Sequence, residues 1–239
     1  MYYSIIIATL NSSRFLDRAL RSILVQKFGG YEILVQDGGS TDGTLDILKK
    51  YGKRISWNSE ADRGIYDAWN KAVGRSRGDW ILFLGADDFL LSENILGLCA
   101  GDLSLLPSET IFAYGRLALG RNGRPATRIH NSLTAMYSLF FRGTGLPFSA
   151  TFIRSSVFAR HRFDSSFTIA GDLEFTLRLL SADNVAALPH AIAFMENGGI
   201  SDSAATADLL CREKSRILRE LVLPKAGLIA EACLKYLAC

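Results

Sequence analysis

Short apolar runs alternate with amphipathic stretches along the first 90 residues of the chain. Each run is short for a helix and is bounded by glycine or charged residues, which is the pattern of a buried strand. The runs are Tyr2–Ala8, Tyr31–Gln36, Arg54–Ser59 and the apolar centre of Gly78–Asp88. Between them, apolar residues recur at helical spacing within Phe15–Leu24, Leu45–Leu48 and Ile65–Val73. This alternation predicts a mainly parallel sheet covered by helices, and therefore an α/β fold.

Beyond Asp88 the regular alternation is lost. The dipeptide Asn122-Gly123 is a hairpin signal, and it lies between two predicted strands, Thr110–Leu119 and Ala126–His130. Further expected elements are a short strand at Ala150–Ile153, a helix after Ile169–Gly171, a strand at Val185–Met195, and a helical tail from Ala207 to Cys239 that Pro224 interrupts. We find no obvious linker, so we expect one domain over residues 1–205, with halves 1–90 and 91–205, followed by the tail 206–239.

Carboxylates follow the predicted strands of the first half. Asp37 ends the second strand, Asp62 follows the third, and Asp87-Asp88 follow the fourth. Ligands of open α/β sheets bind outside the carboxyl ends of the strands, so we expect these side chains to line one crevice. Adjacent residues leaving a strand point to opposite sides, which predicts that Asp87 and Asp88 diverge. One of them would then suit Mg²⁺ or Mn²⁺ beside substrate phosphates, although an ordinary turn is an equally simple interpretation.

Composition and charge narrow the class of protein. A net charge of +3 over 239 residues is too small to indicate a nucleic-acid partner, and the four cysteines and three histidines lack zinc-site spacing. The chain begins with a predicted strand and has no long apolar run, which predicts a cytoplasmic protein without a signal peptide. No G-x-G-x-x-G follows the first strand and no Walker A sequence is present, which argues against a dinucleotide dehydrogenase and a P-loop enzyme.

Four motifs, in order along the chain, resemble family 2 of the glycosyltransferases. They are Ser4–Asn11 (SIIIATLN), Gln36–Thr44 (QDGGSTDGT), Ser59–Lys71 (SEADRGIYDAWNK) and Leu84–Asp88 (LGADD). The match covers most of residues 3–90 and continues more weakly to about Ser201. The resemblance implies a GT-A type, Rossmann-like fold that binds a nucleotide-sugar donor.

The resemblance also implies donor-side roles for particular residues. The matching nucleotide-sugar-binding positions are Thr9, Asp37, Asp62, Arg63 and Asp87. Of these, Thr9 and Asp37 match positions that hold the base, usually uracil, whereas Asp62 and Arg63 match a loop beside the base and diphosphate. Asp87 and Asp88 match the DXD-like motif, with Asp88 as ligand of a Mn²⁺ or Mg²⁺ cofactor and Asp87 facing the donor ribose or sugar.

Several polar residues of these motifs have a structural interpretation as well. For Asp67 and Asn70, helix capping or pinning of a loop has about equal weight with a role at the site. Asp42 is expected to cap the second helix, and Asn11 or Ser12 the first.

A general base is expected in the second half. Inverting sugar transfer needs a group that accepts the proton of the attacking hydroxyl. Asp172, in the segment Phe163–Leu179, matches the family position for this base, and the dipole of the helix that it begins favours the ionised form. From the residues alone, a simple helix cap is the stronger interpretation of Asp172. Glu174 is the alternative base, and Arg178 is expected to pair with a carboxylate or lie on the helix surface.

The acceptor side departs from the family pattern. Many relatives have a His-Gln pair near Pro147–Thr151, where this chain has Phe148 and Ser149, and neither side chain can act as a base. Asn197–Ser201 resembles a flexible, glycine-containing loop over the donor, with a plain turn as the alternative. The basic and apolar residues of the tail suit either a helix on the cytoplasmic face of the inner membrane or one packed on the domain.

Two functions of different classes remain after these observations. The first is an inverting, metal-dependent hexosyl- or N-acetylhexosaminyltransferase that moves a sugar from a UDP-linked donor to a saccharide or lipid-linked saccharide. The second is a catalytically silent module that binds sugar nucleotides and scaffolds glycan assembly. The retained Asp87, Asp88 and Asp172 favour the enzyme. A nucleotidyltransferase is disfavoured because no phosphate-binding glycine loop follows the first strand.

Overall fold

Four parallel strands form one end of a nine-stranded sheet. The computed structural model describes residues 3–121, 124–129, 146–196 and 204–222. The parallel strands lie in the order β3-β2-β1-β4, so that β1 is paired on both sides. Their bounds are β1 Tyr3–Thr9, β2 Tyr31–Asp37, β3 Ser56–Ser59 and β4 Trp80–Phe83. The connecting helices are α1 Leu16–Leu24, α2 Thr44–Tyr51 and α3 Ile65–Val73, which confirms the predicted alternation.

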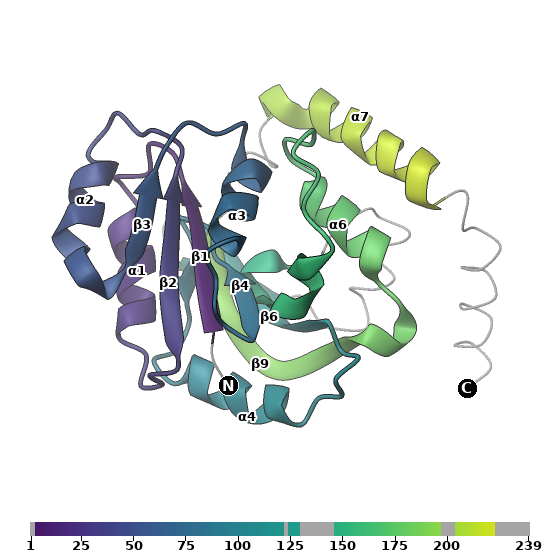
Figure 1. Ribbon diagram of the computed structural model, residues 1–239, viewed down its shortest axis with the longest axis horizontal. Helices are drawn as coiled ribbons and strands as arrows, with labels where there is room; N and C mark the ends of the chain where they lie inside the picture. Colours follow the sequence, from purple (N-terminus) through teal and green to yellow (C-terminus); the bar gives the residue numbers. More distant parts are fainter. Residues whose placement is uncertain (1–2, 122–123, 130–145, 197–203, 223–239) are drawn as a thin grey trace.

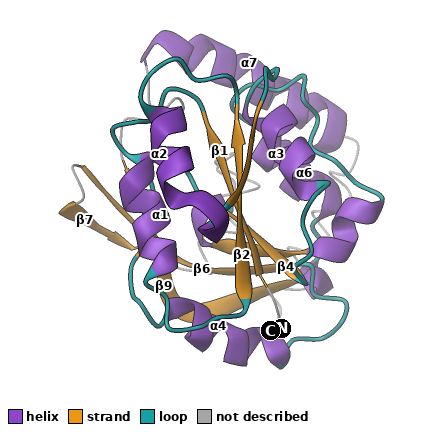
Figure 2. Cartoon of the chain, turned by 60° about the vertical axis from the view of Figure 1, so that its left-hand side comes forward, coloured by secondary structure: helices purple, strands orange, loops and turns teal. Residues whose placement is uncertain are grey.

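The apolar residues of β1 pack into two hydrophobic clusters, one on each face of the sheet, because successive side chains of a strand point to opposite faces. Ile5 and Ile7 pack in a cluster with α1, α2 and a further helix, α4 (Ile95–Ser104), whereas Ile6 packs in a cluster with α3 and α6 (Gly171–Leu179). Figure 2 shows α1 and α2 on one side of the sheet and α3 and α6 on the other. The unbroken apolar run of this strand therefore follows from its burial on both faces.

The sheet continues into the second half of the chain with antiparallel and mixed pairing. Strand β8 (Thr151–Arg154) is antiparallel to β4, and the order continues through β6 (Phe112–Arg121) and β9 (Val185–Glu196) to β5 (Phe89–Leu90). Strand β7 (Arg124–Ile129) pairs with β6 as the predicted hairpin. Short 3₁₀ segments occupy Gly52–Arg54, Phe148–Ala150, Ser155–Ala159, Ala182–Asn184 and Ala204–Thr206.

The tail begins as a helix that packs on the domain. Helix α7 (Ala207–Ile217) continues into a π-helical turn, Leu218–Val222, and its Ile217 is buried in the cluster of α3 and α6. Figure 1 shows α7 above α6, at the edge of the sheet toward which β1, β2 and β3 point. Residues 223–239, the rest of the tail for which either a membrane surface or packing on the domain was expected, lie outside the described part. Among the residues described, no helix has the length and apolarity that crossing a bilayer requires.

Helix starts were the least accurate predictions. The first helix has Phe15 as its N-cap, not Asn11 or Ser12, and the second has Gly43, not Asp42. Asn11 instead has a left-handed backbone (φ 51°), and its side-chain oxygen accepts the Thr41 amide. Asp42 likewise accepts a distant amide, that of Ser13 at 3.0 Å, while its other oxygen accepts the Thr44 amide at the start of α2 at 2.9 Å. Asn11 and Asp42 therefore tie neighbouring loops together.

Two elements were not predicted, namely β5 and α4. Strand β5 has only two residues. Helix α4 has apolar residues or glycine around most of its circumference, so its sequence lacks the one-sided stripe that identifies an amphipathic helix.

Candidate functional site

The carboxylate of Asp37 is buried at the carboxyl end of β2. One oxygen accepts hydrogen bonds from the Gly39 amide (3.0 Å), the Ser40 amide (2.9 Å) and the Ser59 hydroxyl (2.6 Å). The other accepts the Ser40 hydroxyl at 2.5 Å. Asp37 is fully buried, so its first effect is to fix the loop that follows β2.

Asp37→Ala is expected to lower the free energy of unfolding by on the order of 3 kcal/mol, because it leaves buried amides and hydroxyls without an acceptor. Affinity for UDP, the nucleotide that the motifs imply, should fall with it, since the loop beside the implied base position loses its anchor. Urea denaturation measured beside a UDP titration checks both effects. Unchanged stability with weakened UDP binding would show that Asp37 contacts the base and does not anchor the loop.

Thr9 lies opposite Asp37 in the register of β1 and β2. Its carbonyl accepts the Gly38 amide at 2.9 Å, and its side-chain hydroxyl is buried without a hydrogen-bond partner among the described residues. A buried hydroxyl without a partner is unusual in a native protein. Thr9 therefore presents an unused donor and acceptor at the end of the central strand.

Asp62 joins this pair through Gly38. One carboxylate oxygen of Asp62 accepts the Gly64 amide at 2.9 Å. The other lies 2.7 Å from the point where a Cβ on Gly38 would stand, so the close approach depends on glycine. Thr9, Asp37 and Asp62 are thus gathered at one edge, as the strand pattern predicted.

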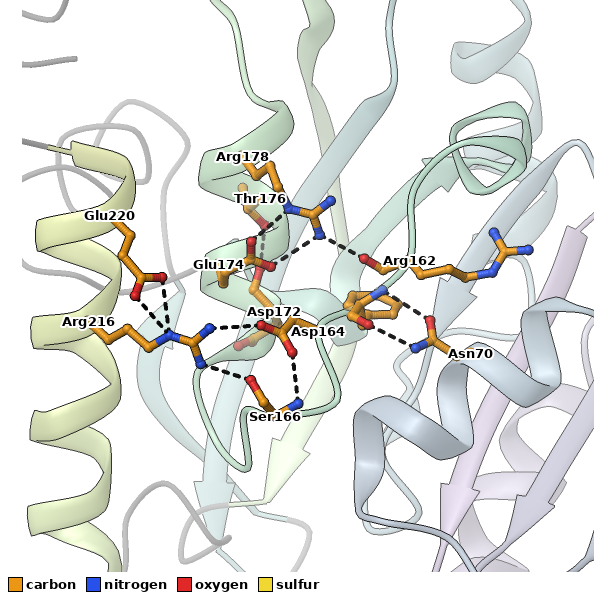
Figure 3. Close-up of polar contacts among 11 residues, drawn as sticks. Asn70, Arg162, Asp164, Ser166, Asp172, Glu174, Thr176, Arg178, Arg216 and Glu220 are labelled. Atoms are coloured by element: carbon orange, nitrogen blue, oxygen red, sulfur yellow. Dashed lines mark hydrogen bonds and ion pairs between the residues drawn. The ribbon is translucent and has the colours of Figure 1, made fainter. Parts of the chain in front are cut away.

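Arg63 turns away from this group. Its guanidinium contacts Asp67 at 3.3 Å, and 76% of its side chain is exposed. Asp67 also accepts the Arg63 amide at 3.2 Å, so it pins the loop before α3. Asn70 pins a second loop by donating to the Phe163 carbonyl (2.9 Å) and accepting the Phe163 amide (3.0 Å), as Figure 3 shows.

Asp87 and Asp88 lie in a turn after β4, not at the end of the strand. The Asp88 amide donates to the Gly85 carbonyl at 3.1 Å, which closes this turn. An Asp88 oxygen and an Asp87 oxygen lie 2.7 and 3.0 Å from the position of a Gly85 Cβ. The prediction that the two side chains diverge was wrong, because β4 ends at Phe83 and the turn brings both carboxylates to the same face of Gly85.

Asp88 is the more buried of the two, with 3% of its surface exposed. The Ser149 hydroxyl and the Gly85 amide donate to one oxygen, and the Glu196 amide donates to the other. Burial, and then the charge of Asp87, raise the pKa of Asp88 to about 7. Burial also raises the pKa of Asp87, and the Glu196 carboxylate adds to that effect.

Arg18 of α1 balances part of this negative charge. Its guanidinium donates to the Asp87 carbonyl at 2.5 Å and to the Glu196 carboxylate at 2.9 Å. Arg18, Ser149 and Glu196 were not predicted as site residues. In the sequence, Arg18 is a polar residue beside an apolar helix stripe, Ser149 lies in a predicted loop and Glu196 lies at the end of a predicted strand. Polar residues at such places are common, so none of the three stands out.

The turn fits a hard divalent cation. Its two carboxylates share the space beside Gly85 that a side chain would fill, and both have raised pKa values that a nearby positive charge would offset. No cluster of three or more metal-ligating side chains occurs among the described residues. The fit is therefore to an ion such as Mg²⁺ or Mn²⁺ that takes one or two carboxylates and completes its shell with ligand phosphates and water.

Asp172 forms a separate polar cluster at the start of α6. It is the second residue of the helix, and the N-cap is Ala170, so the interpretation of Asp172 as the cap was wrong. One oxygen of Asp172 accepts the Leu173 amide at 2.8 Å and lies 3.2 Å from the Tyr66 hydroxyl. Burial raises the pKa of Asp172 to about 6, against the opposing effect of these two hydrogen bonds. The pKa of Asp172 is thus shifted in the direction opposite to the one expected for a carboxylate at a helix start.

Tyr66 of α3 connects Asp172 to the preceding loop. Its hydroxyl donates to the Ile169 carbonyl at 2.6 Å, and burial raises its pKa well above the usual value, so it remains a protonated donor. A Cβ on Gly171 would meet the Tyr66 ring at 2.8 Å, so glycine is required there. Tyr66 lies within a recognised motif but was not singled out, because its contact with Asp172 is not visible in the sequence.

Glu174, the alternative base, is already paired. Arg178 donates to its two oxygens at 2.7 and 3.2 Å, and Figure 3 shows this pair on α6. The prediction that Arg178 pairs with a carboxylate is confirmed. Both oxygens of Glu174 are thus occupied by the Arg178 guanidinium, so Asp172, whose partners are the Leu173 amide and the Tyr66 hydroxyl, is the better candidate.

Comparisons with known proteins bear on the identity of the chain. Residues 4–100 match the family model described as Glycosyl transferase family 2. A PGL/p-HBAD biosynthesis glycosyltransferase of Mycobacterium bovis (strain BCG / Pasteur 1173P2) is 31% identical over 219 residues, which cover 88% of this chain and 83% of that protein. An uncharacterized glycosyltransferase of Mycobacterium tuberculosis is 31% identical over 180 residues, covering 73% of this chain and 67% of that one.

Solved structures share the fold at low sequence identity. S. aureus TarS 1–349 in complex with UDP-GlcNAc aligns over 95% of this chain and 69% of that one, with 22% identity and a TM-score of 0.72. The mannosyltransferase PcManGT from Pyrobaculum calidifontis, in complex with GDP-Man and Mn²⁺, aligns over 98% of this chain and 80% of that one, with 15% identity and a TM-score of 0.61. The fold is the GT-A type predicted from the motifs. Because residues 4–100 match the family model and the mycobacterial transferase is 31% identical over 88% of the chain, the chain belongs to glycosyl transferase family 2.

Proposed function

We propose that this glycosyltransferase is inverting and uses Asp172 as its general base. The observation that carries the proposal is the half-buried Asp172 carboxylate, which lies 3.2 Å from the Tyr66 hydroxyl and whose pKa is raised to about 6. A base of this pKa is ionised at neutral pH and is still basic enough to accept a proton during attack. The donor is a nucleoside-diphosphate hexose or N-acetylhexosamine, UDP-linked, and the acceptor is a saccharide or a lipid-linked saccharide.

The donor lies along the edge formed by Thr9, Asp37 and Asp62. The free hydroxyl of Thr9 and the carboxylate of Asp62 can bind base and ribose hydroxyls, while Asp37 holds the loop between them. Arg63 reaches the diphosphate by leaving its exposed pairing with Asp67, which costs little because surface ion pairs are weak. Asp87 faces the donor ribose or sugar.

Asp88, with Asp87 beside it, would hold the divalent cation. When bound, Mn²⁺ or Mg²⁺ supplies charge neutralisation for the leaving diphosphate. The Ser149 hydroxyl orients the Asp88 carboxylate through its hydrogen bond, and Arg18 limits repulsion from Glu196. Ser149 thus orients Asp88 from a segment in which many relatives have a histidine instead.

The transfer step is a single displacement. The acceptor oxygen forms a bond to the anomeric carbon of the donor, and the bond from that carbon to the diphosphate oxygen breaks with its electron pair. The proton of the acceptor hydroxyl moves to Asp172, which then loses it to water. Attack from the side opposite the leaving diphosphate inverts the anomeric configuration.

A thermal-shift panel tests the donor part of this proposal. UDP-GlcNAc, UDP-glucose and GDP-mannose are each added with and without Mn²⁺, and release of nucleoside diphosphate is measured for the donor that stabilises most. A ligand that binds only the folded state raises the melting temperature. We expect Mn²⁺-dependent stabilisation and turnover. Stabilisation without turnover would favour the silent scaffold, and no stabilisation by any donor would contradict the assigned site.

The pH dependence of kcat follows from the pKa of Asp172. The base acts in its ionised form, so kcat at saturating donor should fall tenfold per pH unit below about 6 and reach a plateau above it. The rate at saturating donor is the useful quantity, because donor binding itself depends on the ionisation of Asp88. A kcat that is flat between pH 5 and 8 would exclude Asp172 as the titrating base.

A further inference from the structure

A buried carboxylate of α7 holds the loop that leads to Asp172. Glu213 is 7% exposed, and one of its oxygens accepts the Thr168 amide at 2.7 Å. The other accepts the Ile169 and Ala170 amides at 3.0 and 2.8 Å. These partners lie 43 to 45 residues before Glu213 in the sequence. Glu213 therefore satisfies three successive amides immediately before α6.

The same loop segment contacts the catalytic cluster on its other side. The carbonyl of Ile169 accepts the Tyr66 hydroxyl at 2.6 Å, and that hydroxyl lies 3.2 Å from Asp172. A tyrosine hydroxyl has one proton to donate, and here two acceptors compete for it. The position of the Ile169 carbonyl therefore decides how strongly Tyr66 can donate to Asp172. A continuous chain of contacts thus runs from Glu213 through the Ile169 peptide and Tyr66 to Asp172.

We propose that Glu213 is a positioning residue for Asp172, so that α7 contributes to the orientation of the general base. The proposal rests on the assignment of Asp172 as the base. Only an ionised carboxylate can accept all three amides, because a glutamine would turn its NH₂ group toward at least one N–H donor. Another contact of α7 with the loop, from Arg216 to Asp164 (3.1 Å) and Ser166 (2.8 Å), is shown in Figure 3 and lies farther from Asp172 in the sequence than the Glu213 contacts do.

Loss of the Glu213 charge should lower the pKa of Asp172. The charged or titratable groups that face Asp172 are Tyr66 on α3 and Lys214 on α7, beside Glu213 itself. If the loop loosens, more water reaches the half-buried Asp172 carboxylate and Tyr66 donates to it more fully, and both changes stabilise the ionised form. In Glu213→Gln, the pH below which kcat falls should therefore be lower than in the wild type.

The experiment is a double-mutant cycle of Glu213→Gln and Asp172→Asn in the full chain. Release of nucleoside diphosphate is measured at saturating donor, with the donor chosen by the thermal-shift panel. A small misplacement of a catalytic group costs up to about 10²-fold, so Glu213→Gln should lower kcat roughly 10- to 100-fold with donor KM nearly unchanged. In the Asp172→Asn background the same change should cost less than about twofold, because the group that it positions is absent. Asp208→Asn, at an exposed position of α7, is the matched charge control and should leave kcat and its pH profile unchanged.

The outcomes separate this inference from the assignment of Asp172. An equal loss of kcat from Glu213→Gln in both backgrounds, or a lower melting temperature with normal kcat and pH profile, would make Glu213 a structural residue only. If Asp172→Asn lowers kcat and Glu213→Gln does not, the positioning role alone is refuted. If Asp172→Asn has no effect, the base assignment fails, and the positioning role is refuted with it.

Discussion

Asp172→Asn is expected to lower the rate of sugar transfer about 10²–10⁴-fold, the usual contribution of general-base catalysis. Asparagine has nearly the same size and its oxygen can still accept the Leu173 amide, but its amide group cannot accept the acceptor proton at neutral pH. Donor affinity should stay near that of the wild type because Asp172 acts on the acceptor hydroxyl. The measurement is a transfer rate at saturating donor beside a titration of the same donor.

Glu174→Gln is the matched control for this variant. It removes a carboxylate two residues away on the same helix, but one that Arg178 already holds. Its transfer rate should stay within a few fold of the wild type, although its melting temperature should fall because an ion pair is broken. If Glu174→Gln caused the large loss and Asp172→Asn did not, the base would have to be reassigned to Glu174.

Asp88→Asn is expected to abolish Mn²⁺-dependent donor binding. The variant removes a hard anionic ligand beside Gly85 and keeps a side chain that can accept the Ser149 hydroxyl. Donor titration with and without Mn²⁺ measures the effect. Wild-type donor affinity with the same metal dependence would show that the cation is held elsewhere.

The same substitution should not destabilise the protein without ligand. The pKa of Asp88 is raised to about 7 in the folded state, so the carboxyl adds stability at low pH that is lost as the pH rises through about 7. Asparagine carries no charge and avoids this loss. We therefore expect the melting temperature of Asp88→Asn at pH 8 to equal or exceed that of the wild type, which separates loss of function from loss of folding.

The gathering of Asp37 and Asp62 at one edge of the sheet was predictable because its signals are local. Parallel strands bring their carboxyl ends to one edge, so Asp37 and Asp62 could be placed together from the strand pattern alone. The error concerned Asp87 and Asp88. Whether two adjacent carboxylates diverge or converge depends on where the strand ends, and a boundary shift of a few residues reverses the answer.

The contacts around Asp172 could not be predicted because they depend on packing between distant segments. Tyr66 and Asp172 are 106 residues apart, and Glu213 reaches the loop from the far end of the described chain. In the sequence, Glu213 is one charged residue among several on a helix. Its burial and its three amide partners follow only from how α7 docks on the domain.

The anomeric configuration of the first product tests the central claim, a single displacement assisted by Asp172, most directly. Proton NMR spectra recorded early in the turnover of an α-linked donor such as UDP-GlcNAc, with water as the acceptor, identify the configuration of the released sugar before it mutarotates. Attack opposite the leaving diphosphate predicts a β-configured product. An α-configured product would mean retention, and it would contradict a mechanism in which Asp172 activates the acceptor for direct displacement.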